Sequence, residues 1–263
     1  MEVNDIIRKL EVLAPPHLAL DWDNSGLQIG DTSTGVTNIL LALDIDERVI
    51  DEAISLGAEL IVTHHPLIFK GVKNITTQTK PGQWMIKLIQ NGISVYASHT
   101  NLDIAEGGVN DSLFEVLELT NKVALQDLDN NQGMGRVGDT TKEYTLQEFA
   151  NFVSQKLNTK LVRYVGEPNA KVTRVALCGG AASDLDFFKS AVNKGAQVYI
   201  TGDIRYHETQ RAQGVGINLI DGTHFATENI ALKDVKTYIE KETANQVKVH
   251  LSQVDLQPFK GVL

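Results

Sequence analysis

One pattern of elements occurs twice along this chain, and it restricts the possible folds more than any other feature. Residues 56–63 read Leu-Gly-Ala-Glu-Leu-Ile-Val-Thr, and residues 194–201 read Lys-Gly-Ala-Gln-Val-Tyr-Ile-Thr. In both copies the glycine ends a helical pattern, and the apolar run after it is typical of a buried strand. Another apolar strand precedes each helical pattern, which completes a βαβ unit. We therefore expect an α/β fold.

The similarity between the two halves extends beyond these segments. Residues 171–177 resemble residues 35–41, and residues 216–220 resemble residues 92–96, in the same order along the chain. The first half differs mainly by a long polar loop at 67–82. Chance similarity of two βαβ segments is the alternative, but the shared order of elements favours an internal duplication.

The duplication predicts the domain organisation. We expect two similar α/β subdomains, residues 1–130 and residues 139–263, that face each other across a metal-containing cleft. The join between them, residues 129–138, is rich in asparagine and glycine, which interrupt regular elements.

Composition excludes several classes of protein. The formal net charge is −9 and basic residues are not clustered, so the chain lacks the surface that binds nucleic acid phosphates. Cys178 is the single cysteine, which excludes an internal disulfide and a cysteine zinc site. Because no apolar run is long enough to span a bilayer, we expect a soluble, cytoplasmic protein without a membrane partner.

Two adjacent histidines follow a buried strand in the first half. The strand, residues 60–62, runs into Thr63-His64-His65-Pro66, and the proline prevents the ladder from continuing. In an open α/β sheet, ligands collect at the carboxyl ends of strands, so two imidazoles there form a candidate metal half-site. The alternative is a pair of polar surface residues in a loop.

Two later strands end in similar polar segments. One leads to His99 and Asp103, and its counterpart in the second half leads to Asp221, His224 and Glu228. On a helix, a spacing of four places His224 and Glu228 on one face, one turn apart. If the halves face each other, these segments converge with the histidine pair.

The resulting donor set contains three imidazoles and two carboxylates: His64, His65, Asp103, His224 and Glu228. Five donors are too many for one tetrahedral site with an open position and suit two divalent ions that activate water. Such mixed ligands accept Zn, Fe, Mn, Co or Ni, and the sequence does not distinguish among them. Asp103 as a turn residue and Glu228 as a first-turn helix residue are the alternatives.

Other polar residues in these loops are candidates for catalysis or substrate binding. We expect His99 and His207 to move protons, although His99 could instead orient a neighbour. The expected substrate-binding residues are Lys70, Arg136, Asp203 and Tyr206. Lys73 and Arg205 are further basic residues that could hold a phosphate, and a solvated surface role is the alternative for each. Asp203 could equally cap a helix.

Five motifs, in this order, resemble those of a known family, the GTP cyclohydrolase 1 type 2 homologs or NIF-three-like dinuclear metal-centre proteins. They are Asp23-Asn24-Ser-Gly-Leu-Gln, Thr63-His-His-Pro-Leu67, Ser98-His-Thr-Asn-Leu-Asp103, Gly202-Asp-Ile-Arg-Tyr-His207 and Asp221-Gly-Thr-His-Phe-Ala-Thr-Glu228.

The resemblance implies a duplicated α/β fold, a two-metal site made by the five donors above, and a ring-shaped homohexamer. Some relatives carry a domain inserted between the halves, and the short join here resembles the form without it. The family name implies opening of the guanine ring of GTP. The better-known GTP cyclohydrolases use a cysteine-bound and histidine-bound zinc, and this chain has no cysteine cluster.

Two functional hypotheses follow. The first is a dinuclear metal-dependent hydrolase, GTP cyclohydrolase type 2-like, that acts on a nucleotide or phosphorylated small molecule through activated water. The second is a non-catalytic hexameric protein that binds metal for storage, scaffolding or regulation. A carboxylate-bridged site, which usually keeps a position open for water, favours the hydrolase.

Overall fold

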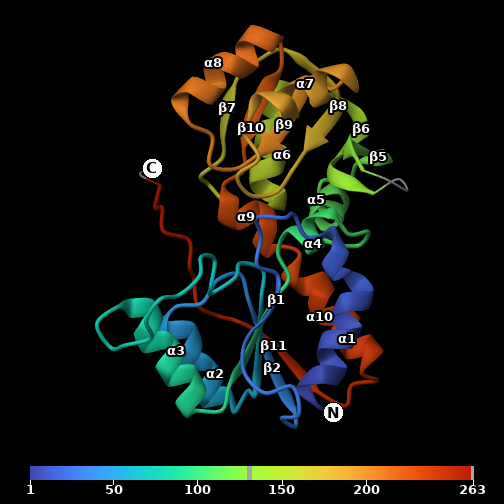
Figure 1. Ribbon diagram of the computed structural model, residues 1–263. Helices are drawn as coiled ribbons and strands as arrows, with labels where there is room; N and C mark the ends of the chain where they lie inside the picture. The colour runs from blue at the N-terminus through green and yellow to red at the C-terminus, as the bar shows by residue number, and fades with distance from the viewer. Residues whose placement is uncertain (129–131, 262–263) are drawn as a thin grey trace. The chain divides into compact units, whose positions relative to one another are not determined.

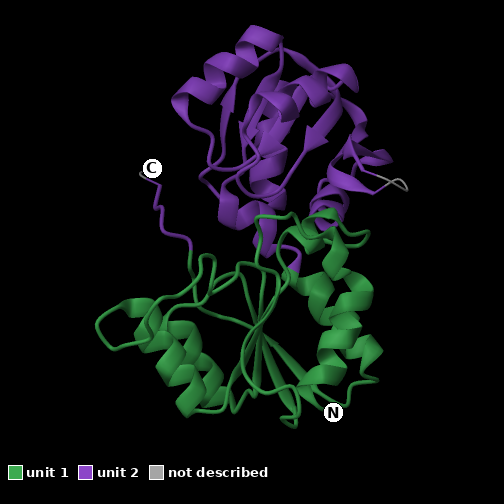
Figure 2. Cartoon of the chain, in the orientation of Figure 1, with its two compact units in different colours: residues 1–108, 232–256 green, residues 109–231, 257–263 purple. Residues whose placement is uncertain are grey.

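The computed structural model describes residues 1–128 and 132–261, and the chain forms two compact units (Figure 2). Unit 1 comprises Met1–Gly108 and Leu232–Leu256, and unit 2 comprises Val109–Ala231 and Gln257–Leu263. Within the described residues, no helix is long and apolar enough to cross a membrane.

Unit 1 is a sheet with helices on both faces (Figure 1). Its strands, in spatial order, are β1 (Gly26–Ile29), β4 (Ser94–Ala97), β3 (Leu60–Thr63), β2 (Asn38–Ala42) and β11 (Lys248–Leu251). Neighbouring strands from β4 to β11 are parallel, and β1 is antiparallel to β4. One face carries α1 (Val3–Leu13) and α10 (Leu232–Glu242), and the other carries α2 (Glu47–Leu56) and α3 (Lys80–Gln90). The short helices η1 (Pro16–Leu18) and α4 (Thr100–Ile104) contact each other.

Local sequence explains the βαβ unit that leads to the histidine pair. The Asp46 carboxylate accepts hydrogen bonds from the first backbone amides of α2, and Gly57 ends this helix in the left-handed conformation, with φ of 62°. All four residues of β3 are buried between β2 and β4, as expected for a central parallel strand.

Unit 2 repeats this plan. Its strands, in spatial order, are β5 (Thr120–Asp127), β6 (Gly133–Thr145), β8 (Lys171–Leu177), β9 (Val198–Thr201), β10 (Asn218–Asp221) and β7 (Arg163–Val165). Its helices are α5 (Val109–Val116), α6 (Leu146–Lys156), α7 (Leu185–Asn193), α8 (Tyr206–Val215) and α9 (His224–Asn229). The apolar side chains of α5 and α6 pack in one core cluster, and those of α7 and α8 pack in another.

The duplication expected from the sequence is visible in the topology. The order β1-β4-β3-β2 in unit 1 corresponds to β7-β10-β9-β8 in unit 2. In each unit three of these strands are parallel, and the outer strand β1 or β7 is antiparallel to its neighbour. The α/β fold with two similar subdomains is therefore confirmed.

The borders of the units differ from the expected division at residues 130 and 139. The last helix and strand of each repeat belong to the other unit: α5 and β5 lie in unit 2, whereas α10 and β11 lie in unit 1. The reason is strand pairing, because β5 pairs with β6 and β11 pairs in parallel with β2. Sequence similarity gives the order of the elements but does not indicate which sheet edge a terminal strand joins.

Candidate metal centre

In unit 1 the two adjacent histidines lie directly beyond the carboxyl end of β3. The backbone amides of His64 and His65 still donate to carbonyls of the Ala42–Leu43 segment beside them, at 3.4 and 2.9 Å, before Pro66 ends the pairing. His64 is buried, with 1% of its surface exposed, and His65 is half-buried. The adjoining strand β4 leads in the same way to His99, the residue that precedes α4.

These loops bring three imidazoles together. Ligand atoms of His64, His65 and His99 all lie within 4.8 Å of one another, and their ring centroids are 5.0 to 5.5 Å apart. On α4, the buried carboxylate of Asp103 places Oδ1 3.6 Å from Nε2 of His64. We call these four residues the unit 1 donor cluster. The structure thus brings the two histidine motifs of the first half together within this unit.

The Nδ1 atom of each histidine in this cluster faces a hydrogen-bond acceptor. His64 faces the carbonyl oxygen of Ser98 at 2.9 Å, His65 faces the Asp44 carboxylate at 2.8 Å, and His99 faces Asp23 at 2.7 Å. A carbonyl or carboxylate oxygen can only accept, so Nδ1 carries the hydrogen and the lone pair of the neutral ring is on Nε2. Histidines that bind metals are commonly oriented in this way.

Asp23 is the most heavily bonded of these acceptors, and its side chain is fully buried. Burial raises its pKa, but hydrogen bonds from His99, Thr100 and Ser25 outweigh burial, so the pKa of Asp23 lies well below its ordinary value. The carboxylate is therefore ionised at neutral pH and keeps His99 in one orientation.

In unit 2, the predicted His224–Glu228 pair lies on α9. Nε2 of His224 lies 3.0 Å from Oε2 of Glu228, as the spacing of four predicts. Nδ1 of His224 faces the Asp203 carboxylate at 2.8 Å. Glu228 is buried, with 4% of its surface exposed, whereas His224 is half-buried. We call His224 and Glu228 the unit 2 donor pair.

The backbone around the donor pair is unusual. Asp203 and Thr223 have positive φ values of 53° and 67°, which are rare for residues other than glycine. A Cβ atom on Gly180 would lie 2.1 Å from Oε1 of Glu228, so a glycine is needed for the carboxylate to lie where it does. Strained backbone of this kind concentrates at functional sites, because other contacts must hold it in place.

The donors in both units fit a divalent ion. Imidazole nitrogen and carboxylate oxygen are ligands that Zn, Fe, Mn, Co and Ni accept, and thiolate is absent from both groups. The residues that fix the Nδ1 atoms, Asp23, Asp44 and Asp203, act on the imidazoles rather than on an ion.

Sequence reasoning missed the orienting role of Asp23 and Asp44. Asp44 lies two residues beyond the end of β2, at the sheet edge where β3 delivers the histidines, so its position after a buried strand was an available signal. Asp203, which we expected to bind substrate, accepts from His224.

The remaining predicted residues lie in varied settings. Lys70 and Lys73 are exposed in the long loop of unit 1. Tyr206 and His207 are exposed on α8 and contact each other. Arg205 lies 3.3 Å from Glu208.

Arg136 is buried in unit 2. It donates to the Asp111 carboxylate at 2.5 Å and to the carbonyl oxygens of Gly133 and Gly135. These contacts indicate that it secures the start of β6 rather than holding a phosphate.

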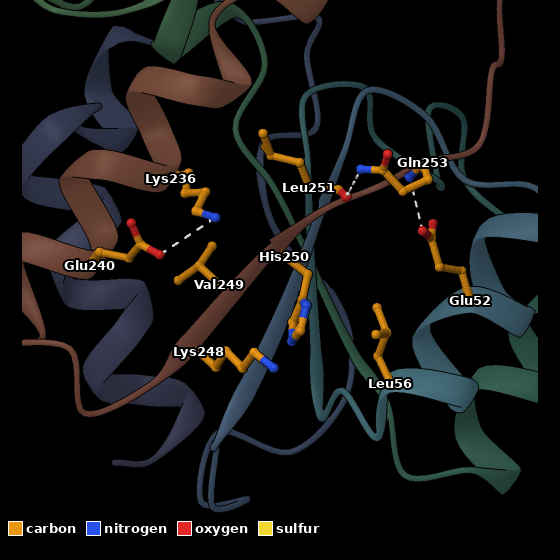
Figure 3. Close-up of a pocket in the computed structure, with 9 residues that line it drawn as sticks. All are labelled: Glu52, Leu56, Lys236, Glu240, Lys248, Val249, His250, Leu251 and Gln253. Carbon is orange, nitrogen blue, oxygen red and sulfur yellow. Dashed lines mark hydrogen bonds and ion pairs between the residues drawn. The ribbon is translucent and has the colours of Figure 1, made fainter.

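A cavity of about 450 Å³ lies at the free edge of β11 in unit 1 (Figure 3). Among the charged groups around it, Glu52 accepts from the backbone amide of Gln253, and Lys236 lies 3.6 Å from Glu240. Its lining contains none of the residues of the donor cluster, so we do not assign the function to it.

Comparison with known proteins agrees with the resemblance noted in the sequence. Residues 1–258 match the profile of the family Duf34/NIF3 (NGG1p interacting factor 3). Proteins named GTP cyclohydrolase 1 type 2 homolog from Clostridium perfringens and Clostridium acetobutylicum are 40% and 35% identical to this chain. The alignments cover 100% of both chains in the first case, and 99% of this chain and 98% of the relative in the second.

A solved structure shows the same fold. The Bacillus cereus protein related to NIF3 superposes with a TM-score of 0.94 at 30% identity, over 100% of this chain and 99% of that chain. The full-length sequence matches and the shared fold lead to one conclusion: this chain belongs to the Duf34/NIF3 family.

Proposed function

We propose that this protein is a divalent-metal-dependent hydrolase that binds two ions through His64, His65, Asp103, His224 and Glu228. The observation that carries the proposal is the orientation of the imidazoles. Each predicted histidine ligand directs Nδ1 at a fixed oxygen acceptor, which leaves Nε2 as the basic nitrogen, and each unit places a buried carboxylate close to that nitrogen.

When bound, divalent ions would polarise a carbonyl or phosphoryl oxygen and lower the pKa of water to near neutrality. The protein's own contribution is orientation. Asp44 and Asp203 hold the rings of His65 and His224, and Asp23 holds the ring of His99. With Nδ1 occupied by Asp23, His99 can accept or return a proton only through Nε2, which suits a general base beside the reacting water.

The proposed substrate is a nucleotide or another phosphorylated small molecule. Support comes from the names of the curated relatives, which refer to GTP cyclohydrolase, and from Lys70 and Lys73 in the exposed loop that follows the histidine pair. A flexible lysine in a loop can reach a phosphate as a point charge.

The ligand set is tested by metal analysis of purified variants. We expect two divalent ions per chain in the wild type and loss of at least one in His64→Ala. His250→Ala is the matched control, since His250 lies on β11 and contacts Asn38 rather than the donor cluster. Full metal content in His64→Ala would contradict the proposed ligands.

Catalysis is tested separately on the metal-loaded protein. GTP and a panel of phosphoesters are incubated with the wild type and with Glu228→Ala, and products are separated by chromatography. Turnover by the wild type and its loss in the variant support a hydrolase. Equal background rates in both would argue against it.

One observation favours a second candidate, a metal-storage or scaffold protein. His64 and Glu228 are almost fully buried, and structural metal sites are commonly closed by protein ligands. Two bound ions without turnover of any substrate would be the result expected of this alternative. The homohexamer implied by the family resemblance is also a proposal, and light scattering of the purified protein measures it directly.

A further inference from the structure

Two large aromatic side chains lie exposed beside the unit 1 donor cluster. Trp22 is 59% exposed and Phe69 is 50% exposed, although aromatic residues make up only 6% of the chain. Their ring centroids are 5.9 Å apart with an interplanar angle of 57°. The rings also contact His99, at 5.9 Å from Trp22 and 6.5 Å from Phe69.

The backbone next to the exposed Trp22 is anchored by hydrogen bonds. The residue after Trp22 is Asp23, whose buried carboxylate accepts from Ser25 and Thr100 as well as His99. This network fixes the backbone that carries the indole. Less backbone entropy is therefore lost when a ligand binds against the indole.

The loop that carries Phe69 is tied to the same segment. The side chain of Asn24 donates to the carbonyl oxygen of Ile68 at 2.6 Å, and the amide of Ile68 donates to the side chain of Gln28 at 3.1 Å. Residues far apart in the sequence therefore present one aromatic surface.

We propose that Trp22 and Phe69 form a stacking platform for the flat heteroaromatic ring of a phosphorylated nucleoside, next to the unit 1 donor cluster. This proposal rests on the proposed function, which defines where the reaction takes place. Aromatic side chains accept any nucleobase on their faces, and each such contact commonly contributes about 1–3 kcal/mol. The exposed Lys70 and Lys73 follow Phe69 in the same loop and supply charge for the phosphate.

If the exposed side chains at this place were aliphatic, a protein partner would fit them as well as a nucleotide. Here the two exposed side chains are aromatic, both rings contact His99, and Lys70 and Lys73 follow Phe69 in its loop. That combination matches the apolar face and the charged tail of a nucleotide better than the mixed surface of a protein.

Tryptophan fluorescence of this chain can measure the contact between Trp22 and a ligand. It contains two tryptophans, and Trp84 packs against a core cluster on the α2–α3 side of unit 1. In the variant Trp84→Phe, Trp22 is the single source of indole fluorescence. GMP, AMP and UMP are titrated into metal-free and metal-loaded protein, with ribose 5-phosphate as the ligand that has a phosphate but no base.

We expect the nucleotides to quench the Trp22 emission and ribose 5-phosphate to leave it unchanged. Phe69→Ala in the same background should weaken nucleotide binding about 5- to 150-fold. Ile89→Ala is the matched control, because Ile89 is 57% exposed but lies on α3, before β4 begins rather than beyond its carboxyl end. No quenching by any nucleotide, or equal affinities in Phe69→Ala and Ile89→Ala, would overturn the platform.

This result is independent of catalysis. Nucleotide binding without turnover would retain the platform and refute the hydrolase. Turnover of a nucleotide with the same KM in Trp22→Ala as in the wild type would retain the hydrolase and refute the platform. Circular dichroism and metal content establish that each variant is folded and loaded.

Discussion

Asp23→Asn tests the idea that one buried carboxylate organises the loops around His99. In the wild type, Oδ1 of Asp23 accepts from His99 at 2.7 Å, and Oδ2 accepts from the Thr100 hydroxyl at 2.6 Å and from Ser25 at 2.8 Å. Asparagine has nearly the same shape but replaces one acceptor oxygen with a donor group. Whichever way the amide is turned, at least one buried donor loses its acceptor.

The magnitude follows from these contacts. A hydrogen bond to a charged group contributes about 1.5–3 kcal/mol, and leaving a buried donor unsatisfied costs about 1–3 kcal/mol. We therefore expect Asp23→Asn to lower the free energy of unfolding by about 3–5 kcal/mol at neutral pH. The measurement is urea unfolding of the metal-free protein, so that metal binding does not contribute.

The pH dependence gives the decisive check. Because folding lowers the pKa of Asp23, its stabilisation is present above the unfolded-state pKa of about 3.9 and is lost as the pH falls toward the folded-state pKa. The difference between wild type and Asp23→Asn should therefore shrink below about pH 4. Asp31→Asn is the control, since Asp31 is exposed and its carboxylate accepts from the amide and hydroxyl of the nearby Ser33. A difference independent of pH, or no larger than that of the control, would refute the reasoning.

Three further predictions concern the donor groups and their supports. Asp44→Ala should lower metal affinity about 10- to 100-fold with the fold intact, as measured by competition with a chelator, because the ring of the neighbouring histidine is released; unchanged affinity would exclude this role. Gly180→Ala should impair metal binding, because its Cβ would strike the α9 carboxylate, whereas Gly195→Ala has the same backbone strain without such a contact and should retain it. Arg136→Met should lower the free energy of unfolding by about 1.5–3 kcal/mol without raising KM for any substrate found, because the buried Asp111 carboxylate loses this hydrogen bond and keeps Lys122 as another partner; a raised KM with normal stability would instead support phosphate binding.

The sequence by itself determined the fold class and the family. The repeated βαβ pattern indicates where apolar strands end and which residues follow them. The carboxyl ends of parallel strands lie at the same edge of a sheet. From that rule we expected the segments after these strands to converge if the two halves face each other, and the structure brings His64, His65, His99 and Asp103 together within unit 1. The spacing of four on a helix likewise predicted the His224–Glu228 contact.

Apart from the position of Asp44 after a buried strand, the sequence did not indicate the partners that orient these donors. Asp44 is 21 residues from His65, and Asp23 is 76 residues from His99. Periodicity describes burial along one element and carries no information about a hydrogen bond between side chains from separate loops. The same limit explains why Arg136 seemed available for a phosphate, although it is buried against Asp111.

Only the tertiary structure decided which unit each terminal element joins and which aromatic rings meet. The strand β11 completes the sheet of the first repeat, because the free edge of β2 offers it a parallel ladder. Trp22 and Phe69 come from loops that the sequence separates by more than a complete βαβ unit. Both facts depend on long-range pairing, whose free energy is set by the whole fold rather than by any local run of residues.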